Sequence, residues 1–496
     1  MRLRQAPTTK AQNPVSLRGR FSVSTQLNVG TSSSQLPVAI LGGGITGLAA
    51  AHRLARQGRA FRLFDAAPRL GGNIRSERAG DWLLEAGPNS LQLTPALAAL
   101  CAELGLNPLI ASPAAKNRYL VRNGRVLAAP ASAPGFVKTP LFSARAKIRL
   151  FGDLFLRPRQ RPADVCLADF VAEHFGTELV DYGLRAFVAG VYAGDASQLS
   201  ARLSFPSLWE AERSHGSIIR GMIASAKAKK ARGEARGPTP LISFPEGLEA
   251  LPLALAARLP SGSVALQARV TALVPDTEPA KTWTVHWTSP DQASHCETFA
   301  SVILALPAAA LAALLIGAAG ALATRPLAGL EPITYPPVSS LFLGYRREQV
   351  RHPLDGFGML IPPAEKRDVL GVLFNSTLFP GRAPNGHVGI TVMTGGALRP
   401  EMALVDDQTL LARVSTELGS LLGVSGAPVF MRRNVWPKAI PQYNLGYERF
   451  LDQIIGVETA HPGLLIGGHV RDGIAVPQCL AAGEKLAARA LGGVEK

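Results

Sequence analysis

Glycines near the start of the chain have the spacing that a bound dinucleotide requires. The apolar residues 38–41 predict a short strand, Gly42-Gly43-Gly44-Ile45-Thr46-Gly47 follows it directly, and residues 48–57 predict a helix. Glycines between a strand and a helix allow a tight turn, close approach of a diphosphate to the backbone, and packing of the helix on the strand. The amides at the helix N-terminus then face the phosphates.

An acidic residue stands where such a fold binds a ribose. The predicted strand 60–64 ends at Asp65. This aspartate lies about 20 residues beyond the glycines, where a carboxylate that accepts ribose hydroxyls is expected. A glycine-rich turn without a ligand is the alternative, but such a turn has no need of an acid in this register.

Two more glycine-rich segments favour FAD over NAD as the cofactor. They span residues 69–75 and 85–90 and contain Gly71, Gly72, Gly87, Pro88 and Asn89. A nicotinamide enzyme has no evident use for these additional sites of close backbone approach. A flavin bound lengthwise needs backbone contact along both its diphosphate and its ring, so we predict that the chain binds FAD.

Other kinds of chemistry find no support in the sequence. The four cysteines lie far apart with no C-x-x-C pair, which argues against a zinc ribbon, an iron–sulfur cluster or a disulfide framework. The nine histidines form no H-E-x-x-H or similar ligand spacing, and there is no recognisable Ser/His/Asp or Cys/His motif. We predict no metal and no catalytic side chain, because the flavin would carry the chemistry.

The positive charge of the chain is concentrated in three segments. The net charge is +16, and residues 1–35, 116–161 and 213–236 account for all of the excess. Within residues 134–161, basic side chains alternate with many large apolar ones, as in an amphipathic segment at an anionic membrane surface. Nucleic acid does not require so much apolar surface. An ordinary helix with a solvated basic side is the other alternative.

Two segments resemble targeting or membrane-spanning sequences. Residues 1–35 are rich in Ser, Thr and Arg and lack acids, which is typical of a transit peptide or a disordered extension but not of a secretion signal. The uncharged run 298–324 is long enough to cross a bilayer, but Pro307 divides it. We predict a buried strand at 301–306 and an Ala-rich helix after Pro307 rather than a membrane span.

Five blocks, in order, resemble the FAD-dependent, oxygen-using protoporphyrinogen oxidase family, within the amine-oxidase-type flavoprotein superfamily. The resemblance covers about residues 38–491. The blocks are residues 71–90, with Gly-Gly-Asn-Ile and Glu-Ala-Gly-Pro-Asn-Ser; residues 118–124, Arg-Tyr-Leu-Val-Arg-Asn-Gly; residues 187–206, from Phe-Val-Ala-Gly-Val-Tyr-Ala-Gly-Asp to Leu-Ser-Phe-Pro; residues 436–443, Trp-Pro-Lys-Ala-Ile-Pro-Gln-Tyr; and residues 467–476, Gly-Gly-His-Val-Arg-Asp-Gly-Ile-Ala-Val.

The resemblance implies roles for individual residues. Arg118 falls where the family pairs an arginine with a porphyrinogen propionate, although Lys116, Asn117 or Arg122 could supply this contact instead. Leu360 and Leu373 would pack on the pyrrole rings with Phe187 facing them, the Gly190 carbonyl would accept a pyrrole N–H, and Met393 would lie near the flavin. The implied FAD contacts are Gly42, Gly43, Gly44, Ile45, Thr46, Gly47, Asp65, Gly71, Gly72, Gly87, Pro88, Asn89, Val270, Trp436, Ile474, Ala475 and Val476.

The implied activity is the oxidation of protoporphyrinogen IX to protoporphyrin IX in haem or tetrapyrrole biosynthesis, by hydride transfer to FAD with release of hydrogen peroxide. A coproporphyrinogen III oxidase of the same family is the nearest alternative. A flavin amine oxidase is less well supported, because residues 468–473 lack the aromatic residue of the amine-oxidase cage. A non-catalytic FAD or porphyrin binder is the remaining alternative. The implied partners are the porphyrinogen, dioxygen and a membrane surface, not nucleic acid; a homodimer and hand-off to a chelatase are compatible with this interpretation.

We predict a mixed α/β and α+β fold with a discontinuous Rossmann-like FAD-binding domain. This domain would combine residues 36–95, 237–310 and 436–496. Residues 96–236 would form a helical substrate- and membrane-binding domain, and residues 311–435 a strand-rich substrate-binding domain. A bacterial cytoplasmic location with peripheral membrane association is expected, or a plastid or mitochondrion if residues 1–35 are a transit peptide.

Overall fold

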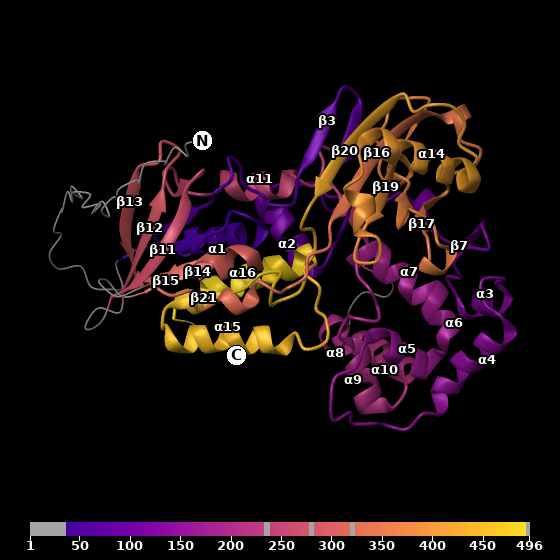
Figure 1. Ribbon diagram of the computed structural model, residues 1–496, viewed down its shortest axis with the longest axis horizontal. Coiled ribbons are helices and arrows are strands. Elements are labelled where there is room, and N and C mark those ends of the chain that lie inside the picture. The colour runs from indigo at the N-terminus through magenta and orange to yellow at the C-terminus, as the bar shows by residue number, and fades with distance from the viewer. Residues whose placement is uncertain (1–35, 233–238, 277–281, 318–322, 493–496) are drawn as a thin grey trace, which may run out of the picture.

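The computed structural model of the protein describes residues 36–232, 239–276, 282–317 and 323–492. The predicted N-terminal extension, residues 1–35, lies outside the described residues. Figure 1 shows three regions: a parallel sheet with its helices on the left, a mixed sheet at the upper right, and a lobe of short helices at the lower right.

A five-stranded parallel sheet forms the centre of the first region. Its strands are β1 (Val38–Leu41), β2 (Phe61–Phe64), β10 (Val264–Ala265), β14 (Ser301–Leu304) and β21 (Leu464–Ile466). They lie in the order β10-β2-β1-β14-β21, and every pairing is parallel. Parallel strands are covered on both faces, which explains why β1 and β14 are continuous apolar runs that are buried along their whole length.

Different elements cover the two faces of this sheet. On one face, Ile40 and Leu63 pack against α1 (Ile45–Arg56), α2 (Pro95–Leu104), α11 (Ala250–Ala257) and α16 (Val476–Ala490). On the other face, Leu41 and Leu304 pack against a second sheet and against α12 (Ala308–Ala313) and α15 (Glu448–Ala460). The second sheet has the order β13-β12-β11-β15. Its strands are β11 (Arg269–Pro275), β12 (Trp283–Thr288), β13 (Ser294–Phe299) and β15 (Leu315–Ile316).

The uncharged run around Pro307 folds as predicted. Its first part is the buried strand β14, and α12 begins directly after Pro307, which is the N-cap residue of this helix. Among the residues that the structure describes, which exclude 318–322 of this run, no helix has the length and apolar character needed to span a membrane.

A seven-stranded mixed sheet dominates the second region. Its strands are β7 (Asn117–Arg122), β8 (Arg125–Ala128), β16 (Val338–Arg346), β17 (Gly356–Leu360), β18 (Gly371–Leu373), β19 (His387–Gly395) and β20 (Phe430–Trp436). They lie in the order β20-β16-β19-β18-β17-β7-β8. The long helix α14 (Asp407–Leu422) covers one face and joins its core. The prediction of an α/β fold with a second, strand-rich region is thus confirmed.

One hairpin of this sheet lies in a segment predicted to be mostly helical. Strands β7 and β8 are joined at Asn123 and Gly124, whose φ angles of 52° and 70° are those of a type I′ turn. Tyr119 and Val121 face the core of the mixed sheet. The Asn-Gly pair between two alternating apolar runs was the local signal for this hairpin.

Two small sheets connect the large regions. The hairpin of β3 (Ser76–Ala79) and β4 (Trp82–Glu85) follows the second glycine-rich segment. Strand β9 (Leu241–Ser243) pairs with both β5 (Leu91–Gln92) and β6 (Leu109–Ile110). The short helix α13 (Asn375–Leu378) follows β18.

The third region is a lobe of short helices. They are α3 (Ala133–Lys138), α4 (Ala144–Gly152), α5 (Leu167–Phe175), α6 (Thr177–Leu179), α7 (Arg185–Phe187), α8 (Ala201–Ser204), α9 (Pro206–His215) and α10 (Ile218–Ala231). Wider π-helical turns, Val180–Leu184 and Val188–Tyr192, flank α7. Turns of this kind frequently occur at functional sites.

A buried polar network holds the loop between α4 and α5. Asp153 accepts hydrogen bonds from Ser217 Oγ (2.5 Å) and from the Ile219 amide (2.9 Å) at the start of α10. His174 bridges Asp153 and Glu212, and Arg161 forms an ion pair with Glu212 (2.7 Å). Both ends of the loop 153–161 are therefore fixed to the same buried cluster.

Helices α1 and α16 approach each other closely at Gly483, and a substitution there tests this contact. A Cβ atom on Gly483 would lie 2.2 Å from the carbonyl oxygen of Thr46 and 2.8 Å from Ala49 Cβ. We expect Gly483→Ala to lower the free energy of unfolding by about 1–3 kcal/mol, because the helices must separate. Chemical denaturation of the purified protein would measure this loss.

The matched control is Gly456→Ala in α15, where an added Cβ meets no atom within 4 Å. Alanine in an open helical position is expected to stabilise the protein by about 0.4–1 kcal/mol. Equal effects of the two substitutions would contradict the close contact of α1 with α16.

Candidate active site

The glycines after β1 differ in what surrounds them. A Cβ on Gly42, whose φ is +105°, would lie 2.4 Å from the Ala305 carbonyl oxygen, and one on Gly47 would lie 1.8 Å from the Gly42 carbonyl oxygen. A Cβ on Gly44 would meet no atom within 4 Å. Two of these glycines are thus required by packing, whereas Gly44, the N-cap residue of α1, borders open space where a ligand can approach the backbone.

Asp65, at the end of β2, closes the glycine turn from the side. Its carboxylate accepts a hydrogen bond from the Gly43 amide (2.6 Å) and one from the Ala67 amide (2.7 Å). A carboxylate has about four lone-pair sites, so ribose hydroxyls could still donate to it. The Ala268 amide donates to the Asp65 carbonyl (2.9 Å), which brings the start of β11, and with it Val270, next to this turn.

The second glycine-rich segment lies directly on the first. The Gly71 amide donates to the Gly43 carbonyl (2.8 Å), and a Cβ on Gly72 would lie 3.2 Å from Gly44 Cα. The Arg69 guanidinium donates to the Gly72 carbonyl (2.6 Å) and fixes the turn. Gly71 and Gly72 both have positive φ angles, of 100° and 57°, which other residues rarely adopt.

The third glycine-rich segment lies between the second segment and the mixed sheet. A Cβ on Gly87 would lie 1.9 Å from the Asn73 carbonyl oxygen. The Trp436 indole N–H donates to the Ala86 carbonyl (2.6 Å), and Asn375 Nδ2 donates to Asn89 Oδ1 (3.0 Å). The half-buried Pro88 lies between these contacts. The predicted contacts Gly87, Asn89 and Trp436 are thus brought together.

A buried ion pair next to this segment was not found by sequence reasoning. Glu85 accepts hydrogen bonds from Ser76 Oγ (2.5 Å) and from the Leu248 amide (3.0 Å), and lies 3.4 Å from the Arg382 guanidinium. Burial raises the pKa of Glu85 and lowers the pKa of Arg382. Glu85 begins the third glycine-rich segment, but Arg382 lies far away in the chain and belongs to no local motif, so no sequence signal could have paired them.

The last predicted cofactor segment lies beside the first turn of α1. A Cβ on Gly468 would lie 3.3 Å from Thr46 Oγ1. Ile474 and Ala475 lead into α16, of which Val476 is the first residue. This helix packs on α1 through Gly483. All four predicted cofactor segments therefore converge on the carboxyl edge of β1, β2 and β21, where ligands of such sheets bind.

Four of the predicted substrate residues share one face of the mixed sheet. Gly371 pairs with both Leu360 and Met393, and Gly358 pairs with both Leu373 and Arg118. Cross-strand partners point to the same face. Their neighbours Met359, Val372 and Val392 point to the opposite face and join the core under α14.

The helical lobe meets this face at Gly190. A Cβ on Gly190 would lie 2.4 Å from Leu360 Cδ2, so this glycine lies directly against the leucine side chain. Phe187 lies about one turn earlier on the lobe, and its ring, 39% exposed, contacts Tyr192 and Phe205.

The residues that could bind a propionate differ in the protein groups that they already contact. Arg122 forms an ion pair with Glu178 (2.7 Å) and lies over the Tyr182 ring, with its guanidinium 4.3 Å from the centroid. Asn117 donates to Asp355 (3.0 Å). Arg118 lies over Phe357, and within the part of the chain that the structure describes it forms no ion pair with a carboxylate. Of the two arginines, Arg118 is therefore the one available to an anionic ligand.

The chain matches the family model of the flavin containing amine oxidoreductases over residues 45–491. The chain belongs to this family. Members of the flavin containing amine oxidoreductase family bind FAD, and this chain is an FAD-dependent oxidoreductase. The open space at Gly44, which a side chain would fill, fits the FAD cofactor of the family.

Several relatives of the chain are protoporphyrinogen oxidases. The chain is 32% identical to protoporphyrinogen oxidase 2, chloroplastic/mitochondrial, of Arabidopsis thaliana, with 91% of this chain and 92% of the relative covered. It is 32% identical to protoporphyrinogen oxidase of Bos taurus, with 92% and 98% covered. A crystal structure from Exiguobacterium sp. 255-15 matches with a TM-score of 0.76 at 22% identity, covering 92% of this chain and 98% of the other, which supports the fold.

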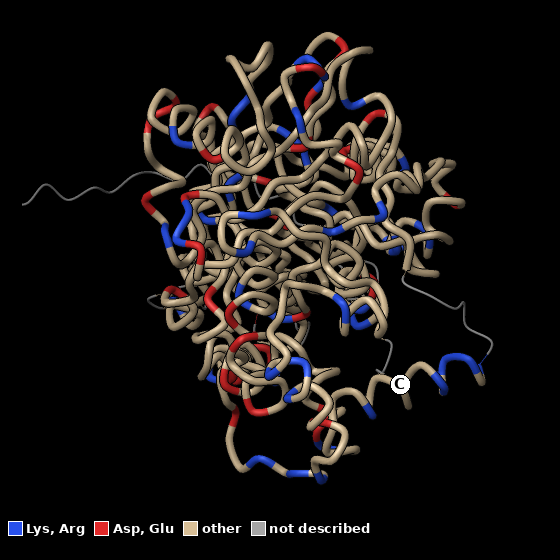
Figure 2. The backbone as a smooth tube through the Cα atoms, turned by 90° about the vertical axis from the view of Figure 1, so that its right-hand side faces the viewer, with Lys and Arg blue, Asp and Glu red and all other residues tan. Residues whose placement is uncertain are grey.

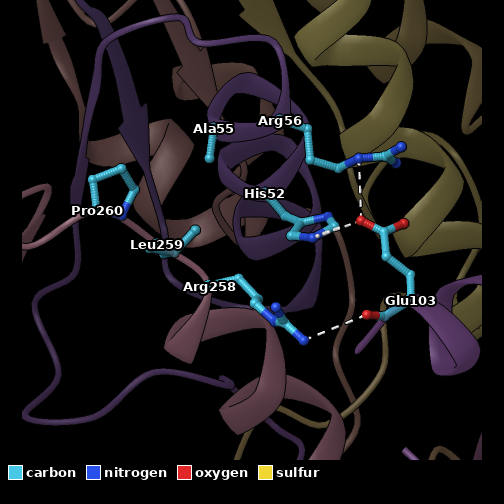
Figure 3. A pocket seen from close by; sticks show the side chains of 7 residues that line it. All are labelled: His52, Ala55, Arg56, Glu103, Arg258, Leu259 and Pro260. Atoms are coloured by element: carbon cyan, nitrogen blue, oxygen red, sulfur yellow. Dashed lines mark hydrogen bonds and ion pairs between the residues drawn. The ribbon is translucent and has the colours of Figure 1, made fainter. Parts of the chain in front are cut away.

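The hollow in Figure 3 belongs to a different part of this flavoenzyme. It has a volume of about 340 Å³, and Figure 3 shows Arg56, His52 and Arg258 around Glu103. Glu103 pairs with His52 Nε2 (3.3 Å) and with Arg56 Nε (3.1 Å). None of the predicted site residues lines this hollow. Glu103 of α2 thus joins residues of α1 and, through its carbonyl, Arg258 at the end of α11, so we assign this hollow a structural role.

The open space at Gly44 generates a second expectation. We expect Gly44→Ala to leave the stability of the apoprotein unchanged, because the new methyl group meets no protein atom and the φ of −70° suits alanine. The affinity for FAD should fall about tenfold or more, since the methyl group costs on the order of 1–3 kcal/mol of overpacking in the complex. Fluorescence titration of the apoprotein with FAD would measure it.

The control is Gly152→Ala at the end of α4, which likewise meets no atom within 4 Å. It should leave FAD affinity unchanged, and as an alanine in an open helical position it should stabilise the protein by about 0.4–1 kcal/mol. Unaltered FAD binding by the Gly44→Ala variant would contradict the assignment of the open space at Gly44 to FAD.

Proposed function

We propose that the protein is an oxygen-using protoporphyrinogen oxidase that converts protoporphyrinogen IX to protoporphyrin IX. The observation that carries this proposal is the shared face of the mixed sheet, with Arg118 at one side, Leu360 and Leu373 between, and Met393 toward the cofactor segments. An apolar macrocycle with anionic arms suits such a face. Relatives about 30% identical over most of their length are protoporphyrinogen oxidases.

The protein side chains would bind and orient the substrate. Bound FAD would supply the redox chemistry, accepting a hydride from the porphyrinogen and passing the electrons to dioxygen to give hydrogen peroxide. The Arg118 guanidinium would pair with a propionate in the forked geometry that carboxylates favour. Leu360 and Leu373 would cover the ring and exclude water, and the Gly190 carbonyl would accept a pyrrole N–H.

We further propose that the domains divide as the sequence predicts. Strands β1, β2, β10, β14 and β21 come from residues 36–95, 237–310 and 436–496 and pair in one sheet, which supports a single cofactor-binding domain. Residues 96–236 would supply the lobe together with the β7–β8 hairpin, and residues 311–435 the rest of the substrate wall.

We also propose that the lobe binds an anionic membrane surface. Large apolar side chains are exposed on α4 and the following loop, with Ile148 73% and Phe155 84% accessible. Arg157 follows Phe155 in this loop, and Lys229 and Lys230 lie in the last turn of α10. Figure 2 shows the positions of the Lys and Arg residues along the backbone. Apolar anchors with cationic flanks are typical of interfacial binding.

Anaerobic reduction of the holoenzyme would test the proposed substrate. We expect protoporphyrinogen IX to bleach the flavin faster than coproporphyrinogen III, with porphyrin fluorescence and peroxide appearing when oxygen is admitted. In the Arg118→Met variant, KM should rise about tenfold or more, because a charge-assisted pair contributes roughly 1.5–3 kcal/mol.

The control is Arg125→Met on the neighbouring strand β8, which should leave KM unchanged. Faster bleaching by coproporphyrinogen III would reassign the substrate. No bleaching by either compound would leave an FAD enzyme of the family with a different substrate, and the proposal would fail.

Vesicle flotation would test the proposed membrane surface. We expect the protein to bind vesicles that contain phosphatidylglycerol, more weakly at high salt. Phe155→Ser should reduce binding about tenfold, because burying a phenylalanine contributes roughly 1.5–3 kcal/mol. Leu404→Ser, at a residue 61% exposed near the mixed sheet, is the control and should bind like the wild type. Equal loss in both variants would contradict the assignment to the lobe.

A further inference from the structure

The segment that follows β20 lies where the three regions of the molecule meet. The Gln442 amide donates to the carbonyl of Thr334, which precedes the long strand β16 (2.9 Å). The Tyr443 carbonyl accepts from the Ser200 amide of the lobe (2.8 Å), and the Tyr443 hydroxyl donates to the His469 carbonyl beyond β21 (2.7 Å). A side chain in this segment can therefore fix the lobe relative to both large sheets.

The side chain of Gln442 is buried and reaches the lobe. Its Nε2 donates to the carbonyls of Tyr192 (2.9 Å) and Ile440 (3.0 Å). Because both partners can only accept, they determine which end of the amide carries the nitrogen. The other end, Oε1, lies against Gly194, where an added Cβ would be 2.3 Å away, and within the described ranges it has no hydrogen-bond partner. The amide of Gln442 therefore has one defined orientation.

The Tyr192 carbonyl is at the end of a π-helical turn of the lobe. Tyr192 is the last residue of the turn Val188–Tyr192, and Ala193 follows it in a left-handed conformation with a φ of 52°. Carbonyls at a helix end have no partner within the helix. Gln442 supplies the partner for Tyr192, and the Ala397 amide, beyond β19, supplies one for Ala193 (2.8 Å). The end of the turn is thus held from two directions.

This π-helical turn carries the residues of the lobe that are predicted to face the substrate. Gly190 lies two residues before Tyr192 and directly against Leu360, while Phe187 immediately precedes the turn. Figure 1 shows α7, which leads into the turn, where the lobe meets the mixed sheet. The position of the end of this turn therefore sets how close Phe187 and Gly190 come to the sheet face that carries Leu360.

We propose that Gln442 is a positioning residue for the substrate. By donating from Nε2 to the Tyr192 carbonyl, it holds Gly190 against Leu360 and so sets the separation of the lobe from the sheet face on which the macrocycle would bind. This inference rests on the proposed function, because it requires that a porphyrinogen bind between the lobe and this face. Gln442 would act through the turn and not by touching the reacting atoms.

Steady-state kinetics of the FAD-loaded enzyme with protoporphyrinogen IX would test the proposal. Gln442→Leu keeps a similar side-chain volume but removes both hydrogen bonds. We expect KM to rise about tenfold, as the loss of a buried hydrogen bond does. FAD affinity and kcat should stay within about twofold of the wild type, because only substrate binding is weakened. A parallel loss of FAD affinity and kcat would show that Gln442 only holds the fold, and would overturn the proposal.

The matched control is Gln453→Leu in α15. Gln453 Nε2 also donates to a carbonyl, that of Pro326 (2.8 Å), and its Oε1 also lies against a glycine, since a Cβ on Gly329 would be 2.4 Å away. The same change is therefore made to the same kind of contact, on a helix of the parallel-sheet region. KM should remain that of the wild type, and a rise equal to that of Gln442→Leu would contradict a specific role for Gln442.

A second variant displaces the Gln442 amide without removing it. The methyl group of Gly194→Ala would press on Gln442 Oε1, so this variant should also raise KM severalfold. In the Gln442→Ala background no amide remains to be displaced, and Gly194→Ala should have no further effect. Additive effects of the two substitutions would mean that Gly194 acts independently of Gln442, against the proposal.

Hydrogen exchange of the FAD-loaded enzyme without substrate would test the hold on the turn directly. In Gln442→Leu, the amides of Gly194 and Ala397, which bond to the carbonyls of Val188 and Ala193, should exchange severalfold faster than in the wild type. Unchanged exchange would overturn the proposal.

Failure of this inference can be distinguished from failure of the proposed function. A wild-type enzyme that neither porphyrinogen reduces would overturn the proposed function and the role of Gln442 with it. An active wild type with an unchanged KM in Gln442→Leu would overturn the role of Gln442 alone.

Discussion

Contacts between backbones at glycine positions hold the cofactor side of the molecule together. Gly47 packs on the Gly42 carbonyl, Gly71 bonds to Gly43, Gly87 packs on Asn73, and Gly483 packs on Thr46. At Gly47, Gly87 and Gly483, an added Cβ would lie no more than 2.2 Å from the facing carbonyl oxygen, so a side chain there would force the backbones apart. These contacts join strand β1, the two following glycine segments and the C-terminal helix α16 into one continuous stack. The open edge of this stack, at Gly44, is available to a ligand.

The mixed sheet depends on this stack because it is joined to the third glycine segment. Arg382 reaches Glu85, Trp436 reaches Ala86, and Asn375 reaches Asn89. The first of these contacts is a buried ion pair, and removing one partner of such a pair typically costs about 3–5 kcal/mol. The face that carries Leu360 and Met393 is thus positioned relative to the cofactor segments by contacts made within five consecutive residues.

Features that depend on neighbours in the chain could be predicted from the sequence, whereas those that depend on distant segments could not. The turn after β1, the acid at Asp65 and the division of an apolar run at Pro307 are local, and the structure has each of them. The Asn123-Gly124 hairpin was equally local but lay in a segment predicted to be helical. The pairs Glu85–Arg382 and Gln442–Tyr192 arise only when separate segments meet, so residue types and spacing carry no sign of them.

The three contacts at Glu85, Ala86 and Asn89 also fasten the wall that would hold the substrate to the segments that would hold the flavin. Six electrons must leave a porphyrinogen to make it aromatic, and a flavin takes two at a time. With both walls fixed, successive carbons of the macrocycle would have to reach the flavin by motion of the macrocycle itself. The apolar sheet face at Leu360 and Leu373 would then matter as a surface over which the macrocycle can turn.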